Sequence, residues 1–237
     1  MKRVFLIGAS SVIANSIVKK LIEDGKTEEV IKISRNPKFE NDKNYIYIEN
    51  YSFLGEVFST FHATYDDLII LAFGYLGITG FRENFPSSLE ENNQKKVFDI
   101  NFTQMRLSLH YSTEFLKNKG GRILYLSSAA AYPVRPSNIP YGLSKKYIDS
   151  FINFQREYLR EFKISILSVR IGFVDTPINK NRKNTPFSST PDKVAKSITT
   201  ALNKNKEIIY IPKILYFLTK FLIIFPKISN HFDKKFS

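Results

Sequence analysis

Short apolar segments alternate with longer amphipathic ones along this chain, and this alternation restricts the possible folds more than any other feature. The segments of strand length are residues 4–7, 30–34, 45–48, 68–72, 122–127, 165–170 and 208–211. The segments of helix length are residues 12–24, 53–62, 89–117, 141–162 and 190–203. Several of the predicted strands are rich in Ile, Val and Leu with little alternation, as expected for parallel strands covered on both faces. The pattern predicts an α/β fold, a doubly wound parallel sheet with helices on both sides.

Length and composition limit the chemistry that the chain can perform. Its 237 residues, 43% of them hydrophobic, fit one domain or at most two. The chain has no cysteine, which excludes disulfides and thiolate ligands, and His62, His110 and His231 are scattered, so no metal site is predicted. The apolar run after Met1 is too short for a signal peptide, so we interpret it as the first strand of a cytoplasmic protein.

The formal net charge of +13 requires an explanation. Nucleic acid, an anionic membrane surface or a phosphorylated substrate could each supply one, and a basic surface without a partner is an equal alternative. The lysines are dispersed and no nucleic-acid motif is present, so we predict no nucleic-acid partner.

The clearest chemical signal is a hydroxyl, a phenol and an ammonium at Ser128, Tyr141 and Lys145. Tyr141 and Lys145 are four positions apart, so on a helix they share one face, where the cation can stabilise a phenolate. The ammonium would lower the phenol pKa from about 10, and a positioned acid of this kind is worth roughly 10²–10⁴ in rate. The alternative is that Tyr141 packs and Lys145 is solvated, so the interpretation depends on the surrounding motifs.

A tight turn of small residues follows the first predicted strand, beginning at Gly8. Such a turn brings backbone N–H groups and a helix N-terminus to one place, which suits a pyrophosphate. Only Gly8 remains of the usual three-glycine pattern, because Val12 and Ala14 occupy the later positions, but small residues still permit close approach. The predicted cofactor-binding residues of this turn are Gly8, Ser10, Ser11, Val12 and Ile13.

The end of the second predicted strand bears on the choice of nucleotide. No acidic residue stands where one would bind both ribose hydroxyls of NAD, and Arg35 at this place suits a 2′-phosphate. The sequence therefore favours NADP and leaves NAD open, while an exposed arginine beside a turn is the alternative for Arg35. Gly74, just after the fourth predicted strand, is expected against the adenosine side of the cofactor, and Ala72 at the end of that strand is a further predicted cofactor contact.

Together these motifs resemble the short-chain dehydrogenase/reductase family over nearly the whole chain. The residues that carry the resemblance are Gly8-Ala9-Ser10-Ser11, Asn101, Ser128, Tyr141 with Lys145, and the run Arg170-Ile171-Gly172-Phe173-Val174 with Thr176. The resemblance implies a Rossmann-type sheet of about seven parallel strands, a nicotinamide cofactor, hydride transfer to or from a carbonyl carbon, and a homo-oligomer.

The resemblance also implies a role for each residue of the site. Tyr141 would be the proton donor or acceptor, and Ser128, whose spacing fits the family better than that of Ser127, would hold the substrate oxygen. Lys145 would bind the nicotinamide ribose and lower the tyrosine pKa, and Asn101 would order the proton-relay water. Further cofactor contacts are implied at Gly172, Val174 and Thr176.

Two departures separate the chain from the commonest members of that family: Ala72-Phe73-Gly74 stands where Asn-Ala-Gly is common, and Ile171 stands where a proline usually precedes Gly172. Residues 71–77, 135–142 and 209–212 are similar to those of decaprenylphosphoryl-2-keto-erythro-pentose reductases. That resemblance implies reduction of a keto sugar on a polyprenyl phosphate, beside a flavoenzyme partner, in cell-wall polysaccharide biosynthesis. Soluble sugars, steroid-like alcohols and acyl ketones remain alternative substrates, and a nucleotide-sensing protein is the non-enzymatic alternative.

The C-terminal region is predicted to be a tail, residues 213–237, outside a single catalytic domain of residues 1–212. Residues 214–225 are strongly apolar and end before Pro226, and the lysines around them are Lys213, Lys220, Lys227, Lys234 and Lys235. The run is shorter than the roughly 20 residues needed to span a bilayer, so it would lie at an anionic membrane surface or pack on the sheet or in a dimer.

The polar residues 176–189 form a predicted loop that could cover the site.

Overall fold

The computed structural model, which describes residues 1–37, 42–82, 85–176 and 187–236, is built on a parallel sheet of seven strands. The strand order is β3-β2-β1-β4-β7-β8-β9. The strands are β1 (Arg3–Ile7), β2 (Glu29–Ser34), β3 (Tyr45–Tyr47), β4 (Asp67–Leu71), β7 (Gly121–Ser128), β8 (Ile164–Ile171) and β9 (Ile208–Ile211). The sheet confirms the predicted Rossmann-type fold, and each strand begins and ends within one residue of its predicted place.

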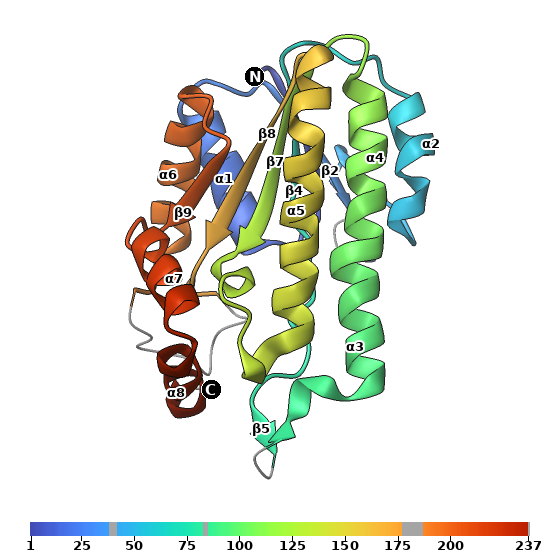
Figure 1. Ribbon diagram of the computed structural model, residues 1–237. Coiled ribbons are helices and arrows are strands. Elements are labelled where there is room, and N and C mark those ends of the chain that lie inside the picture. The colour runs from blue at the N-terminus through green and yellow to red at the C-terminus, as the bar shows by residue number, and fades with distance from the viewer. Residues whose placement is uncertain (38–41, 83–84, 177–186, 237) are drawn as a thin grey trace.

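Helices cover both faces of the sheet (Figure 1). On one face, α1 (Val12–Glu23) and α6 (Pro191–Asn203) pack over the core that contains Val4, Leu6 and Ile70. On the other face lie α2 (Leu54–Ser59), α4 (Met105–Leu116) and α5 (Ile139–Glu161). Phe5 of β1 anchors this second core, with Phe58, Phe61 and Phe115 edge-on around its ring. Such aromatic clusters bury much apolar area and stabilise the contact between helices and sheet.

The register of the strands brings four of their carboxyl ends to one edge of the sheet. Ile7 pairs with Leu71 across β1 and β4, and Ser128 pairs with Ile171 across β7 and β8. The chain order reverses between β1 and β4, which is the place where ligands bind in open parallel sheets. The loops that carry the predicted site all begin at this edge.

The helix predicted over residues 89–117 is interrupted. The structure has α3 (Glu91–Phe98), then a π-helical segment η4 (Asp99–Gln104), then α4. The interruption falls at Asn101, whose buried side chain binds the backbone of Tyr75 instead of facing solvent. Periodicity cannot reveal this change, because apolar spacing continues through a π-helical turn.

Smaller differences occur in three loops and at the C-terminus. The helix predicted over residues 53–62 is shorter, because Tyr51–Phe53 form a 3-10 turn before α2. Two further 3-10 turns, Ala129–Ala131 and Pro136–Asn138, precede α5, and two short strands, β5 (Phe81–Arg82) and β6 (Phe85–Pro86), pair before α3. Residues after β9 form α7 (Leu215–Ile224) and α8 (Pro226–Phe236).

Candidate active site

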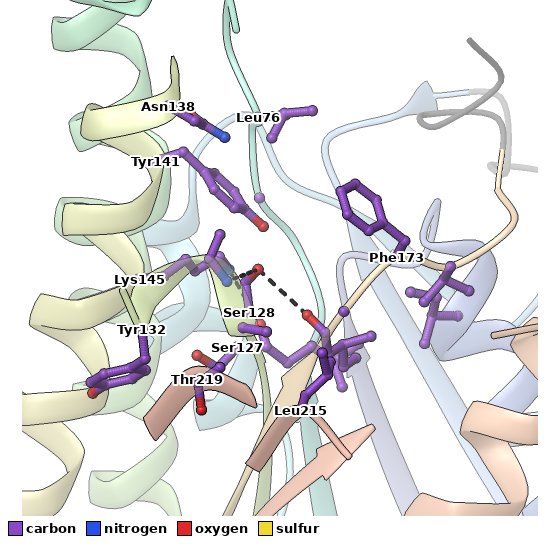
Figure 2. Close-up of a pocket in the computed structure, with 18 of the residues that line it drawn as sticks. Leu76, Ser127, Ser128, Tyr132, Asn138, Tyr141, Lys145, Phe173, Leu215 and Thr219 are labelled. Atoms are coloured by element: carbon purple, nitrogen blue, oxygen red, sulfur yellow. Dashed lines mark hydrogen bonds between the residues drawn. The ribbon is translucent and has the colours of Figure 1, made fainter. Parts of the chain in front are cut away.

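Three of the four predicted catalytic residues line one cavity of about 360 Å³ at the carboxyl edge of the sheet. Ser128 is the last residue of β7, while Tyr141 and Lys145 lie on consecutive turns near the start of α5. Figure 2 shows the three side chains directed toward one another in this cavity. The four-residue spacing therefore has the predicted effect, since both α5 side chains share the face that covers β7.

Ser128 is held by its neighbours at the end of β7. Its Oγ accepts a hydrogen bond from the backbone N–H of Ala130 at 3.1 Å and donates one to the carbonyl of Ile171 at 3.5 Å (Figure 2). The Ser128 side chain also acts on the Tyr141 hydroxyl, as a hydrogen-bonding neighbour that lowers the phenol pKa. The serine hydroxyl therefore stands beside the phenol, where it can help to hold a substrate oxygen.

Burial dominates the protonation of the two α5 residues. It raises the pKa of Tyr141 above its usual value, against the opposing effects of the Ser128 hydrogen bond and the Arg135 charge. Burial also lowers the pKa of Lys145 to about 8, although the charge of Asp149 acts in the opposite direction. The phenol loses more by desolvation than it gains from the Ser128 hydroxyl and the Arg135 charge, and the expectation that Lys145 lowers the tyrosine pKa stays a prediction.

Lys145 itself is 3% exposed and lies at the bottom of the cavity. Its Nζ donates to the carbonyl of Leu126 at 3.2 Å and lies 5.9 Å from the centre of the Tyr141 ring. Its position beneath the tyrosine leaves it able to reach a ligand that enters the cavity.

The fourth predicted residue, Asn101, lies behind the cavity and binds backbone. Its Oδ1 accepts from the N–H of Tyr75 and its Nδ2 donates to the carbonyl of Tyr75, both at 2.7 Å. This clamp fixes the loop after β4 beside Gly74 and Lys145. The role of Asn101 in ordering a water stays a prediction, because its side-chain groups both serve the Tyr75 backbone.

The turn after β1 has the geometry of an anion site. Gly8 has a positive φ of 93°, and a Cβ there would lie 2.7 Å from the backbone nitrogen of Phe73. Any other residue would therefore strain the turn and collide with the loop after β4. Ser11 caps α1 by accepting from the N–H of Ala14 at 3.3 Å, which fixes the helix N-terminus toward the groove.

A second cavity of about 430 Å³ continues from the first along this turn. Six residues line both cavities, Gly74 among them. The predicted cofactor residues that line the second cavity are Ser10, Ser11, Val12, Ile13, Arg35, Ala72, Gly74 and Thr176. The two cavities therefore form one groove from the β1 turn to Tyr141.

Arg35 borders the far end of this groove. Its guanidinium lies 5.1 Å from the centre of the Tyr51 ring, and its Nη1 donates to Oε1 of Gln104 at 3.3 Å. Both contacts orient the side chain at the edge of the second cavity, next to Ser10 and Ser11. Tyr51 was missed from the sequence, where nothing separates it from other core aromatics.

The loop after β8 supplies the remaining predicted contacts. Gly172, Val174 and Thr176 line the first cavity, and a parallel bridge joins Val174 to Ser189. Most of the predicted covering loop, residues 177–186, lies outside the described residues.

Helix α7, the last but one in the chain, forms a wall of the cavity that the sequence did not predict. Its inward residues are Leu215, Leu218, Thr219 and Leu222. Figure 2 shows Leu215 and Thr219 beside Ser127 and Ser128. The helix can approach because residue 172 is glycine, where a Cβ would lie 2.6 Å from a methyl carbon of Leu215. The recurrence of apolar residues at helical spacing over 215–222 was the available signal. The division of the chain at residue 212 stays a prediction.

Curated relatives with sequence similarity are oxidoreductases. An uncharacterized oxidoreductase of Mycobacterium tuberculosis is 26% identical over 144 residues, which cover 60% of this chain and 56% of the relative. One of Schizosaccharomyces pombe is 35% identical over 94 residues, covering 39% and 37%. The chain thus spans about half the length, or less, of these curated relatives.

Solved structures share the fold over almost the full chain. A short chain dehydrogenase of Burkholderia cenocepacia, in complex with NADP, has a TM-score of 0.77 at 18% identity and covers 94% of each chain. An alcohol dehydrogenase of Thermococcus sibiricus, complexed with 5-hydroxy-NADP, has a TM-score of 0.69 at 18% identity, covering 89% of this chain and 95% of that one.

The short chain dehydrogenase family model matches residues 2–186, a range that contains the β1 turn, Asn101, Ser128, Tyr141 and Lys145. Because this match covers most of the sequence, the chain belongs to the short-chain dehydrogenase family.

Proposed function

We propose that this protein is an NAD(P)H-dependent reductase of a ketone, with Tyr141 as the proton donor. The observation that carries the proposal is the convergence of Ser128, Tyr141 and Lys145 in a cavity that continues into the groove beside the β1 turn. A phenol alone on a helix would not suggest chemistry, but a phenol, a hydroxyl and an ammonium beside a nucleotide-sized groove do.

The residues of the groove fit a dinucleotide. The crowded turn at Gly8 and the N-terminus of α1 suit a pyrophosphate, because a helix N-terminus carries backbone N–H groups without intrahelical partners and favours negative charge. Lys145 lies where its ammonium can bind ribose hydroxyls, and Gly172, Val174 and Thr176 border the nicotinamide end. When bound, the cofactor supplies the hydride, and the protein's residues position the carbonyl and provide the proton.

The protonation of Tyr141 fits the role of a proton donor. The raised pKa keeps Tyr141 protonated at neutral pH, so its hydroxyl can donate a proton to an oxygen that gains negative charge. Ser128 would hold that oxygen by a hydrogen bond, and Lys145 would stabilise the phenolate that remains. The nucleotide-sensing alternative would bind the cofactor without turnover of any ketone.

We favour NADP over NAD because Arg35, and no carboxylate, borders the end of the groove beyond β2. Two of the structural neighbours, those of Burkholderia cenocepacia and Thermococcus sibiricus, are complexed with forms of NADP, which is consistent with this choice. Arg35→Ser is expected to weaken NADPH binding by about tenfold or more, because a charge-assisted bond to phosphate is lost, while NADH binding changes little. Equal losses for both nucleotides in a fluorescence titration would contradict the assignment.

The proposed substrate is a keto sugar carried on a polyprenyl phosphate. The lining of the cavity supports this choice, because leucines of α7 and Phe173 give it apolar walls around a polar base (Figure 2). Oxidation of NADPH that requires a polyprenyl-phosphoryl keto-pentose, and that soluble ketoses do not support, is the expected result. Equal turnover of a soluble ketone would favour the alternative substrates. If the lipid-linked keto sugar is the substrate, a flavoenzyme that makes this sugar would be the partner.

The outer surface of the C-terminal helices supports peripheral contact with an anionic membrane. Phe217 and Ile224 are 67% and 70% exposed on α7, and exposed lysines flank them at Lys213, Lys220 and Lys227. Among the described residues, none of the helices has the length and hydropathy for a bilayer crossing. We therefore propose that the protein, in the cytoplasm, lies on the membrane through this surface.

Vesicle sedimentation tests this contact. The protein is expected to bind phosphatidylglycerol vesicles in low salt, and Phe217→Glu should abolish the binding, while the matched change Tyr65→Glu, at an equally exposed aromatic residue before β4, should not. Failure of the unaltered protein to bind such vesicles, or dimer formation through α7, would contradict the membrane assignment.

A further inference from the structure

Only two of the described residues that line the main cavity carry a charge, and one of them is unassigned. Lys145 lies at the bottom of the cavity and is part of the proposed reductase site. Arg135 is the other, in the loop between β7 and α5. Most of the other described residues that line this cavity are apolar, so the charge of Arg135 is a distinctive feature of the lining.

Arg135 lines the same cavity as the reacting tyrosine. Its guanidinium carbon is 6.0 Å from the centre of the Phe173 ring, which Figure 2 shows opposite Tyr141. Its charge also acts on the Tyr141 hydroxyl, whose pKa it lowers. A group bound by Arg135 would therefore lie near the reacting carbonyl.

The C-terminal helix α8 holds this loop in place through Asp233, which is 3% exposed. One carboxylate oxygen accepts from the backbone N–H of Ser137 at 2.8 Å, and the other accepts from the Ser137 hydroxyl at 2.6 Å. The same carboxylate lies 4.0 Å from Nε of Arg135. The short bonds go to Ser137, so Asp233 fixes the loop, and its longer ion pair with Nε helps to orient Arg135.

We propose that Arg135 binds an anionic group of the substrate, a phosphate ester or a carboxylate, that is attached to an apolar chain. The inference rests on the proposed reductase function because it assigns a ligand to the same cavity. A planar guanidinium suits these anions, since it can donate two parallel hydrogen bonds to their oxygens. The apolar chain would lie along the inward leucines of α7, at Leu215, Leu218 and Leu222.

Under this assignment, both C-terminal helices, α7 and α8, contribute to the binding of the substrate. α7 provides the wall for the chain, and α8, through Asp233, keeps the cation beside that wall. Specificity for the headgroup would then depend on Arg135, while Ser128 and Tyr141 act on the carbonyl of any substrate.

Calorimetric titration of the NADPH-saturated protein with decyl phosphate tests the inference without turnover. Arg135→Met is expected to weaken decyl phosphate binding by about 10- to 100-fold, the loss of a hydrogen bond to a charged group. Arg135→Lys should retain part of the affinity, because it keeps the charge and loses the paired geometry. The matched control Arg106→Met, at an exposed position on α4, should bind as the unaltered protein does.

Three further probes separate the possible causes. Decanol, which has the chain without the charge, should bind the Arg135→Met variant as well as it binds the unaltered protein. Decanoate should lose affinity in that variant as decyl phosphate does, and inorganic phosphate should bind far more weakly than decyl phosphate. Retained NADPH affinity shows that the variant is folded.

Unchanged decyl phosphate affinity in Arg135→Met would overturn the inference, as would an equal loss of decanol binding. Inorganic phosphate that binds as tightly as decyl phosphate would overturn the pairing of headgroup and chain. These results are independent of the proposed catalysis, since absence of keto-sugar turnover would leave a selective loss of anion binding intact.

Discussion

At the scale of single residues, Tyr141 carries the proposed chemistry because its hydroxyl stands beside Ser128 at the base of the cavity. Tyr141→Phe is expected to reduce NADPH-dependent turnover by at least ~10²-fold, the usual worth of a positioned acid. NADPH affinity should change little, because the ring keeps its packing. Turnover close to that of the unaltered protein would refute the proton-donor role.

The buried Lys145 makes the free energy of unfolding depend on pH. Its pKa is about 8 in the folded protein and near 10.5 when exposed, so the unfolded chain binds more protons between these values. The free energy of unfolding should therefore contain a contribution that rises with pH from about 8 to about 10.5, on the order of 2–3 kcal/mol.

Urea unfolding at about pH 8 and about pH 10 measures this contribution as a difference between proteins. In Lys145→Met the contribution should vanish, because methionine has no proton to lose. An identical pH dependence in both proteins would show that burial does not penalise the Lys145 charge.

At the scale of elements, the contact between Gly172, just after β8, and Leu215 of α7 shapes one wall of the cavity. Gly172→Ala should push Leu215 outward, lowering the free energy of unfolding by ~1–3 kcal/mol and raising KM for an apolar substrate, since its Cβ has no room. The double variant Gly172→Ala with Leu215→Ala should recover part of the lost stability and part of the increase in KM. No recovery in the double variant would mean that this contact does not determine the wall.

The secondary-structure elements also differ in how well the sequence could predict them. The parallel strands were predictable because Ile- and Val-rich runs of strand length, flanked by amphipathic helices, have few other folds available. The interruption at Asn101 was not, because it depends on a buried amide that binds the distant Tyr75 backbone. The position of α7 was equally hidden, since apolar residues on all its sides fit packing and membrane contact alike.

The residues of the candidate site also differ in whether the sequence could reveal them. Ser128, Tyr141 and Lys145 could be found from spacing, because one strand end and one helix face bring them together. Arg135 and Asp233 could not, since they meet only after the chain returns about 100 residues later. Contacts between distant segments leave no local pattern in a sequence.

At the scale of the whole molecule, the outer face of α5 suggests how copies assemble. Phe154 is 88% exposed there, with Tyr147 and Tyr158 also exposed on the same helix. We expect a second copy to cover this face, so that Phe154→Glu converts the oligomer to a monomer in sedimentation experiments, because it would bury an unpaired charge. A protein that is monomeric without the change would contradict this expectation.

The proposed reaction unites these scales, because it needs the cofactor groove, the tyrosine and the α7 wall at once. Its most direct test uses NADPH deuterated at the transferable position of the nicotinamide, with a polyprenyl-phosphoryl keto-pentose, and mass spectrometry of the product. The account predicts one deuterium on the carbon that carries the new hydroxyl, and almost no product with Tyr141→Phe. A reduced product without deuterium would contradict direct hydride transfer. Absence of this product, while soluble ketones are reduced and labelled, would contradict the proposed substrate.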